Sequence, residues 1–393
     1  FRPIWHGKKP MGGGPSRVGA NALDVVPPSC CFVPATDGRL HFRGRIVKNK
    51  EGVCFDWPCT SFKFKTSASR AWLRMDGGRN YFNVLINGSL VCVLKTFSAV
   101  RDYLVPTDGE SIVEVQKRTE AKIGSITQKE TSSVTLHGLV LEDGSLEDLP
   151  QDTPKRLEFL GDSETSGFGN LGPSQPGVPN LRSVLTVNVA HQDANQAWPA
   201  LVAKAFGADF HNISWSGAGV VWNAGAGCSA DAPFHDLYSR ALGSSQTTSI
   251  DGEWQPDAVV LYLGGNDWWS LSHKGEEPLI AGFRRFLRHL REHRGPDVAI
   301  CILLASPESV CACIGSLEDQ RAFAADMSRC WRAAAEQLED PKVYWDVVDP
   351  KPPCSLSDPA DWGQMGHWSV QGNSKWANAV IPILESRLDW SRI

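Results

Sequence analysis

The stretch that decides the fold is LEFLGDS, residues 157–163, an apolar run that ends in Gly161-Asp162-Ser163. A short apolar run followed by turn residues is typical of a buried strand. A serine on the turn after such a strand stands at the edge of the sheet, where its own N–H can face an oxyanion. Gly, Asp and Ser are also frequent in plain turns and helix caps. The tripeptide therefore needs support from the rest of the chain.

The half of the chain that contains this stretch alternates between strand-like and helical patterns. We expect strands at residues 156–160, 258–263, 298–304 and 343–347, and helices at residues 197–206, 278–293, 317–337 and 374–388. This alternation is the signature of a parallel sheet wrapped by helices, and ligands of such sheets bind outside the carboxyl ends of the strands. The fold class predicted for residues 151–393 is therefore α/β with three layers.

The first part of the chain has a different pattern. Residues 1–29 are rich in Gly, Pro and basic side chains and show no periodicity, so we expect an extended arm. Short strand-like runs at hairpin spacing then occupy residues 40–47, 61–66, 71–75, 81–86, 90–94, 111–117 and 134–141. They predict an antiparallel β-sandwich, or jelly roll, over residues 30–150. The acidic segment at residues 147–154, which ends in proline, is the expected boundary before the α/β domain.

The composition excludes several classes of protein. With 393 residues, 42% hydrophobic and 21% charged, the chain is long enough for two folded domains. A net charge of −5 gives no field that would attract nucleic acid or an anionic membrane. The longest apolar runs, near residues 259–263 and 299–305, are too short to cross a bilayer. We expect a soluble, monomeric protein.

Eleven cysteines are many for a reduced enzyme, and six of them form close sets: Cys30 with Cys31, Cys54 with Cys59, and Cys311 with Cys313. We favour disulfides over unpaired buried thiols, and hence a protein that is secreted or lies in another oxidising compartment. Spacing alone predicts no metal site, because no second CxxC or His pair completes a tetrahedral set. Phe1 opens the chain without a charged and apolar leader, so we read the numbering as that of a processed or truncated product.

Three further stretches carry the residue types of acyl transfer. Residues 212–219 (NISWSGAG) place small residues after a strand, where a backbone N–H can approach a reacting group. Residues 259–267 (VVLYLGGND) form a buried strand that ends at Asn266, whose side chain can donate to an oxyanion. Residues 366–373 (GHWSVQGN) contain His367, which can take the proton of a serine and return it. Each alone reads as a turn or a solvated loop; together with Ser163 they have the order that this chemistry uses.

These four blocks resemble those of the SGNH (GDSL) hydrolases, and more narrowly the acetyl esterases of carbohydrate esterase family 2. The resemblance extends from about residue 40 to the end, through residues 79–84 (RNYFNV), 115–121 (VQKRTEA), 213–217 (ISWSG) and 254–257 (WQPD). It implies Ser163 as the nucleophile and His367 as the base. It also implies three oxyanion donors, namely the N–H of Ser163, the N–H of Gly217 and the side chain of Asn266.

The sequence departs from the superfamily pattern just before the histidine. Most SGNH enzymes place an aspartate three positions earlier, and Gln364 stands there. Either Asp361 or Asp358 reaches the imidazole from elsewhere in the loop, or a backbone carbonyl holds His367 and leaves a Ser–His dyad. We favour the dyad, because a triad carboxylate must meet one ring nitrogen while the other faces serine. Met365 and Gly366 replace the aspartate and aromatic residue that similar members carry, which puts the substrate fit in question.

Fifteen tryptophans are many, and several lie near the four blocks. Aromatic faces stack on sugar rings, although any one tryptophan is more often a core or loop anchor. We select Trp268 first and Trp368 second as substrate contacts. Residues 167–196, with their glycines and prolines, are read as a long loop over the site that sets specificity.

The function that these observations predict is carbohydrate O-acetyl ester hydrolysis through an acyl-enzyme, on an acetylated carbohydrate and with no metal or organic cofactor. One alternative keeps the class but changes the substrate: an SGNH lipase, thioesterase or lysophospholipase with a long acyl groove. A second alternative is a glycan-binding protein whose hydrolase site has decayed, which the residues at 364–366 keep open.

Overall fold

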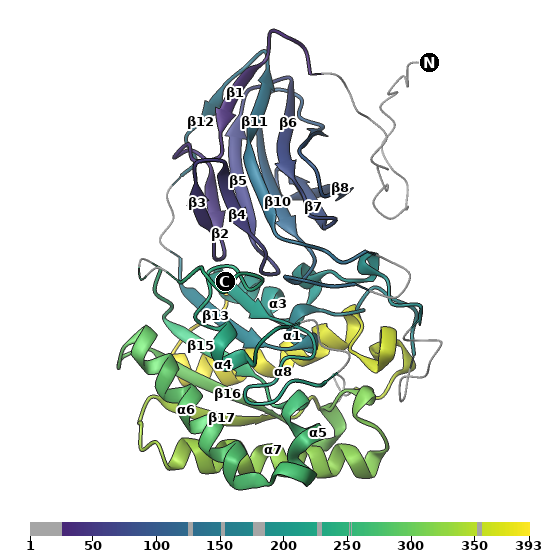
Figure 1. Ribbon diagram of the computed structural model, residues 1–393, viewed down its shortest axis with the longest axis vertical. Helices are drawn as coiled ribbons and strands as arrows, with labels where there is room; N and C mark the ends of the chain where they lie inside the picture. The colour runs from purple at the N-terminus through teal and green to yellow at the C-terminus, as the bar shows by residue number, and fades with distance from the viewer. Residues whose placement is uncertain are drawn as a thin grey trace.

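The computed structural model describes residues 26–124, 129–150, 154–175, 185–225, 230–250, 252, 254–351 and 356–393 (Figure 1). Most of the arm expected at residues 1–29 lies outside these ranges. A β-sandwich made of the first twelve strands stands on an α/β part that holds all the α-helices of the described residues (Figure 1). The predicted fold class, an antiparallel sandwich followed by a three-layer α/β unit, is confirmed.

Two antiparallel sheets form the sandwich. The first has the order β3-β4-β11-β6-β9 with β1 beside β11, and the second has the order β12-β5-β10-β7-β8 with β2 beside β5. Alternate side chains along these strands face inward, as the alternation of buried and partly exposed residues in β10 shows. They meet in a shared core that includes Phe55, Phe62, Phe64 and Phe82. The strands are β1 (Cys31–Pro34), β2 (His41–Arg43), β3 (Val47–Asn49), β4 (Gly52–Phe55), β5 (Ser61–Thr66), β6 (Arg70–Asp76), β7 (Tyr81–Ile86), β8 (Ser89–Lys95), β9 (Arg101–Val105), β10 (Ser111–Lys117), β11 (Val134–Glu142) and β12 (Leu146–Glu147).

A five-stranded parallel sheet forms the centre of the α/β part, in the order β14-β13-β15-β16-β17. The strands are β13 (Arg156–Gly161), β14 (Asp209–Ser214), β15 (Ala258–Tyr262), β16 (Ala299–Ala305) and β17 (Val343–Val348). The α-helices are α1 (Ser163–Ser166), α3 (Trp198–Phe206), α4 (Phe234–Leu237), α5 (Gly265–Lys274), α6 (Glu276–Arg294), α7 (Leu317–Glu336) and α8 (Val370–Leu388). Helices α3 and α8 contact each other and, respectively, β14 and β17; α6 contacts α7, which in turn contacts β16 and β17 (Figure 1). Because both faces are covered, the inner strands read as continuous apolar runs.

The chain order explains where a site can form in this sheet. The strand that follows β13 in the sequence, β14, lies on one side of it, and β15 lies on the other. The carboxyl ends of β13, β14 and β15 therefore sit next to one another at the point where the strand order reverses, which is where open α/β sheets bind ligands.

Several elements differ from the sequence-based expectation. The strand expected at residues 40–47 is split into β2 and β3, because Gly44 has a positive φ of 100° and a Cβ there would lie 2.6 Å from Thr60 Oγ1. Helix α5 was not among the predicted helices; it begins directly after Gly264, whose φ is 114°. Helix α8 begins at Val370 rather than 374, because the Ser369 side chain caps its first turn.

The sandwich and the α/β part are joined by buried polar contacts. Glu158 on β13 is fully buried and pairs with Arg45 from the sandwich at 3.0 Å and with Arg294 at 2.6 Å. These two guanidinium groups overcome the effect of burial and lower the pKa of Glu158 to about 2. Asp56 accepts hydrogen bonds from the N–H groups of Gly243 and Ser244. Within the described ranges, no helix combines the length and apolar character that crossing a membrane requires.

Candidate active site

The Gly-Asp-Ser turn lies where the sequence predicts it, at the carboxyl end of β13. Ser163 is the first residue of the short helix α1, and the Asp162 side chain caps that helix by accepting from the N–H of Glu164. Gly161 is required here, because a Cβ at this position would lie 1.8 Å from Thr165 Oγ1. The turn therefore lifts the Ser163 hydroxyl above the sheet edge.

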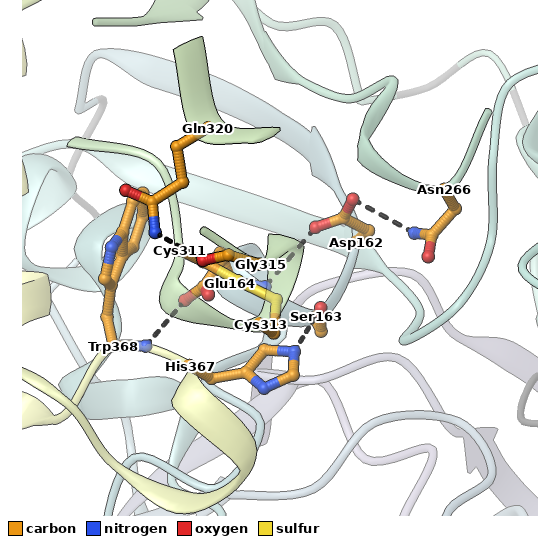
Figure 2. Close-up of a disulfide and its surroundings, with 10 residues drawn as sticks. All are labelled: Asp162, Ser163, Glu164, Asn266, Cys311, Cys313, Gly315, Gln320, His367 and Trp368. Carbon is orange, nitrogen blue, oxygen red and sulfur yellow. Dashed lines mark hydrogen bonds between the residues drawn. A yellow bond between two sulfur atoms is a disulfide. The ribbon is translucent and has the colours of Figure 1, made fainter. Parts of the chain in front are cut away.

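His367 meets this hydroxyl from the last loop of the chain. It follows the 3₁₀ turn Gln364–Gly366 and precedes α8, and its Nε2 lies 2.9 Å from Ser163 Oγ (Figure 2). Phe168 packs edge-on against the imidazole at 5.0 Å between ring centroids. Two residues that are 204 positions apart in sequence are thus within hydrogen-bond distance, as acyl transfer from serine requires.

Burial keeps this imidazole neutral. Removal from water lowers the pKa of His367 to about 4, although the backbone carbonyls of Gln364 and Met365 act in the opposite direction. Its Nδ1 makes no hydrogen bond of standard geometry, so those carbonyls are the acceptors on that side of the ring. A neutral imidazole at physiological pH is the protonation state that a general base needs.

Neither aspartate considered for a triad contacts the imidazole. Asp361 is buried and forms an ion pair with Lys375 at 2.8 Å, and it also accepts from the Gln371 side chain. Asp358 caps the following turn by accepting from the N–H of Ala360. The prediction that Asp361 orients His367 is therefore wrong, because side chains of α8 hold its carboxylate. Gln364, at the usual aspartate position, accepts from Nδ1 of His191 at 2.8 Å.

The three expected oxyanion donors line one cavity with Ser163 and His367. Gly217 adopts a φ of 81°, and the loop that follows it is fixed by Asp267, which accepts from the N–H groups of Val220, Val221 and Trp222. Asn266 donates a side-chain N–H to Asp162 Oδ2 at 3.1 Å (Figure 2). It also donates to the carbonyl of Ala218 at 3.1 Å. An oxyanion that binds Asn266 therefore has to share or replace one of these two hydrogen bonds.

Sequence reasoning missed a carboxylate that supports the oxyanion loop. Glu120 Oε1 accepts from the Ser216 hydroxyl at 2.8 Å, and Oε2 accepts from the Ser216 backbone N–H at 2.5 Å. Burial raises the pKa of Glu120 to about 7, against the effect of these hydrogen bonds. The stretch at residues 115–121 had been noticed only as part of a family resemblance, and no local pattern indicates its partner.

The tryptophans are arranged differently from the prediction. Trp368 is 0% exposed, stacks on Tyr262 and packs at a tilt against Trp376, so its selection as a substrate contact is wrong. Trp268 is partly buried, packs edge-on against Phe323 and donates to Asp326 at 3.0 Å. Its neighbour Trp269 is 50% exposed and lines the cavity. Trp269 is therefore the tryptophan of this pair that a substrate would meet.

The cavity over the site has a volume of about 280 Å³. Its lining includes apolar side chains, among them Phe168, Trp269, Ile314 and Phe323, and the disulfide Cys311–Cys313 (Figure 2). Of the close cysteine sets, this one alone is paired among the described residues; Cys30, Cys31, Cys54 and Cys59 are free thiols. In the loop expected over the site, Phe168 lines the cavity, and residues 176–184 of that loop lie outside the described residues.

A serine at the end of a central parallel strand, hydrogen bonded to a histidine from the last loop, defines the class of serine-dependent ester hydrolases with a three-layer α/β fold. Residues 159–375 match the model of the GDSL-like lipase/acylhydrolase family, and residues 42–146 match the carbohydrate esterase 2 N-terminal model. The chain belongs to the GDSL-like lipase/acylhydrolase family, because that match spans more than half of its length.

The chain is also similar to curated proteins. An acetylxylan esterase / glucomannan deacetylase of Cellvibrio japonicus is 26% identical over 287 residues, which are 69% of this chain and 74% of that protein. The cellulase/esterase CelE of Acetivibrio thermocellus is 25% identical over 324 residues, which are 80% of this chain but only 35% of that protein.

Solved structures share the whole architecture. A family two carbohydrate esterase from Cellvibrio japonicus superposes with a TM-score of 0.74 at 21% identity, over 92% of this chain and 99% of that one. A family two carbohydrate esterase from Clostridium thermocellum in complex with cellohexaose gives a TM-score of 0.73 at 19% identity, over 89% and 99%. At these identities the likeness shows the fold, with the sandwich and the α/β part present together.

Proposed function

We propose that this protein removes acetyl groups from the hydroxyls of a polysaccharide, with Ser163 as nucleophile and His367 as general base. The observation that carries the proposal is the 2.9 Å contact between His367 Nε2 and Ser163 Oγ at the wall of the cavity. The curated relatives named as acetylxylan esterases support the acetyl group and the polysaccharide as the substrate class. The disulfide beside the site supports an oxidising compartment, consistent with secretion.

The reaction proceeds in two halves. Ser163 Oγ attacks the acetyl carbonyl while its proton passes to Nε2 of His367, and the carbonyl oxygen becomes an oxyanion. The N–H groups of Ser163 and Gly217 and the amide of Asn266 stabilise that oxyanion. The carbon–oxygen bond to the sugar then breaks, and His367 returns the proton to the sugar alcohol. Water repeats the sequence on the acetyl-serine and releases acetate.

A dyad suffices in this arrangement because the imidazole has acceptors on its second side. As Nε2 takes the proton, positive charge develops on the ring, and the carbonyls of Gln364 and Met365 face Nδ1. They hold the tautomer with the proton on Nδ1, which leaves the lone pair of Nε2 directed at serine. Gln364 itself is fixed by His191, so the carbonyl is anchored.

The test is acetate release from a panel of acetylated polysaccharides. Ser163→Ala should lower the rate by at least about 10³-fold, because the nucleophile and its chemistry are lost. Ser69→Ala, at an exposed position of the sandwich, is the matched control and should keep the wild-type rate. Wild-type rates on nitrophenyl esters should fall as the acyl chain lengthens from acetyl to octanoyl.

The two alternatives give different results in the same assays. A lipase or thioesterase would act faster on octanoyl than on acetyl esters, and a decayed site would bind glycan but leave Ser163 unlabelled by a fluorophosphonate. Either result would overturn the proposal. Retained acetate release in Ser163→Ala would overturn the assignment of the nucleophile alone.

A further inference from the structure

Four side chains that metal ions commonly use as ligands converge beside the proposed nucleophile. Glu164 comes from α1, His367 from the loop before α8, and Cys311 and Cys313 from the segment that follows β16 (Figure 2). One ligand atom from each of the four lies within 4.8 Å of the others. No CxxC or histidine pair stands near Cys311 in the sequence, so this set is assembled only by the fold.

One member of this cluster has a buried atom without a hydrogen-bond partner. Glu164 is 5% exposed, and while its Oε2 accepts from the Trp368 N–H at 3.0 Å, its Oε1 has no partner. His367 is 8% exposed, and the backbone carbonyls of Gln364 and Met365 are the polar groups that act on its imidazole besides Ser163. A bound cation would supply the missing partner.

The two sulfur atoms are bonded to each other in this structure, and a disulfide is a poor metal ligand. Thiolates, in contrast, are among the strongest ligands of Zn²⁺ in proteins. Around a tetrahedral ion with Zn–S and Zn–N bonds of about 2.3 and 2.0 Å, neighbouring ligand atoms lie roughly 3.3–3.8 Å apart. The present spacing of up to 4.8 Å therefore closes with side-chain shifts of roughly 1 Å once the sulfurs separate.

We infer that reduction of the Cys311–Cys313 disulfide creates an inhibitory Zn²⁺ site formed by both thiolates, His367 and Glu164. The inhibition rests on the proposed function, since it acts through His367. A metal on Nε2 displaces the Ser163 hydroxyl, and a metal on Nδ1 forces the remaining proton onto Nε2. In either case the imidazole cannot accept the proton of serine.

Oxidation of the two thiolates releases Zn²⁺ and restores His367 as the base. The two metal-bound thiolates lose two electrons to a low-molecular-weight disulfide, which becomes two thiols after taking up two protons. The Cys311–Cys313 bond forms, and only His367 and Glu164 remain as ligands of Zn²⁺. The ion then dissociates, and the imidazole returns to Ser163. The enzyme is thus off while its thiols are reduced and on after it enters an oxidising compartment.

The experiment compares the oxidised protein with the protein reduced by a phosphine, in a buffer free of chelators. Zn²⁺ should halve the rate of nitrophenyl acetate hydrolysis at a concentration about 10–100-fold lower for the reduced protein. Each sample is normalised to its own rate without metal. Equal sensitivity in the two redox states would overturn the proposal.

Direct binding separates this proposal from the proposed function, because it needs no activity. Reduced protein should bind one equivalent of Co²⁺ with the near-ultraviolet charge-transfer band of cobalt–thiolate bonds. The double variant Cys311→Ser, Cys313→Ser should lose the band and the reduction-dependent inhibition. The double variant Cys30→Ser, Cys31→Ser removes another close pair of cysteines, and it should keep both the band and the reduction-dependent inhibition.

A second route avoids dependence on the folding of the serine variant. Wild type reduced and then alkylated at Cys311 and Cys313, with the positions verified by mass spectrometry, should also lack the cobalt band. A band that persists after this alkylation, or one that never forms in reduced wild type, would overturn the site.

Discussion

Glu120 holds Ser216 by two hydrogen bonds, one to its hydroxyl and one to its backbone N–H. Glu120 belongs to the segment that follows β10 of the sandwich, whereas Ser216 lies in the loop after β14 of the α/β part. Ser216 directly precedes Gly217, whose N–H is a proposed oxyanion donor. The contact therefore makes the sandwich a structural support of the proposed active site.

Glu120→Gln should lower kcat by about tenfold with little change in KM. Loss of a whole oxyanion donor costs about 10²–10³-fold, and a loosened loop costs less than a missing donor. The ionised carboxylate accepts both hydrogen bonds, so wild-type kcat should also rise as the pH passes about 7, the pKa of Glu120, and this step should vanish in the variant. Kinetics on nitrophenyl acetate across pH measure both effects.

Ser216→Ala, which removes the hydroxyl contact and keeps the backbone N–H contact, should give a smaller loss of kcat. A lower melting temperature with unchanged kcat would reduce Glu120 to a structural role.

Local sequence was enough for the elements that depend on local chemistry. The run at residues 157–163 predicted both β13 and its turn, because apolar and turn residues act through neighbours along the chain. The pairing of Ser163 with His367 followed from the order of four blocks shared with a known superfamily. Contacts that depend on how separate segments dock were not predictable, as in the link between Glu120 and Ser216.

Trp368 shows why single aromatic residues are hard to assign. It stands two positions before α8, which begins at Val370, and its ring packs against Trp376 and Tyr262. The predicted start of the helix was four residues too late, and the Trp368 side chain lies in the core rather than at the surface. The same holds for the cysteines. Three close sets looked alike in sequence, and only the fold shows that Cys311 and Cys313 form a disulfide while the other two sets are free thiols.

The pH dependence of kcat/KM should show an acidic limb near pH 4. The base is active when neutral, so activity is present above the pKa of His367, about 4, and is lost as the pH falls through that value. A histidine with an ordinary pKa would give a limb near about 6.5. Acetate release should be measured from pH 3 upward, in wild type and in Glu120→Gln so that the step near pH 7 does not obscure the result. A limb between pH 6 and 7 in both proteins would show that the imidazole is more solvated than described.

Asp361→Asn should destabilise the protein but leave its chemistry nearly intact. The variant leaves Lys375 without its buried carboxylate partner, at a cost of about 1–3 kcal/mol in the free energy of unfolding. In a triad the same change would lower kcat by about 10⁴-fold, because the imidazole would lose its orienting carboxylate. Denaturant unfolding and kcat, measured on the same preparation, distinguish the two. A kcat loss near the triad value would restore Asp361 as an orienting group.

Trp269→Ala should weaken the use of polysaccharide more than the use of a small ester. The ring is half exposed at the cavity, where it can stack on a sugar, and such contacts are worth about 0.5–1.5 kcal/mol. KM for acetylated polysaccharide should therefore rise by about two- to tenfold, while kcat/KM for nitrophenyl acetate changes less. Trp268→Phe is the matched comparison, because it removes the hydrogen bond to Asp326 and keeps an aromatic ring against Phe323. It should lower the melting temperature without raising the polysaccharide KM. The reverse outcome, a raised KM in Trp268→Phe and none in Trp269→Ala, would place the sugar on the other side of α5 and return Trp268 to the role first predicted for it.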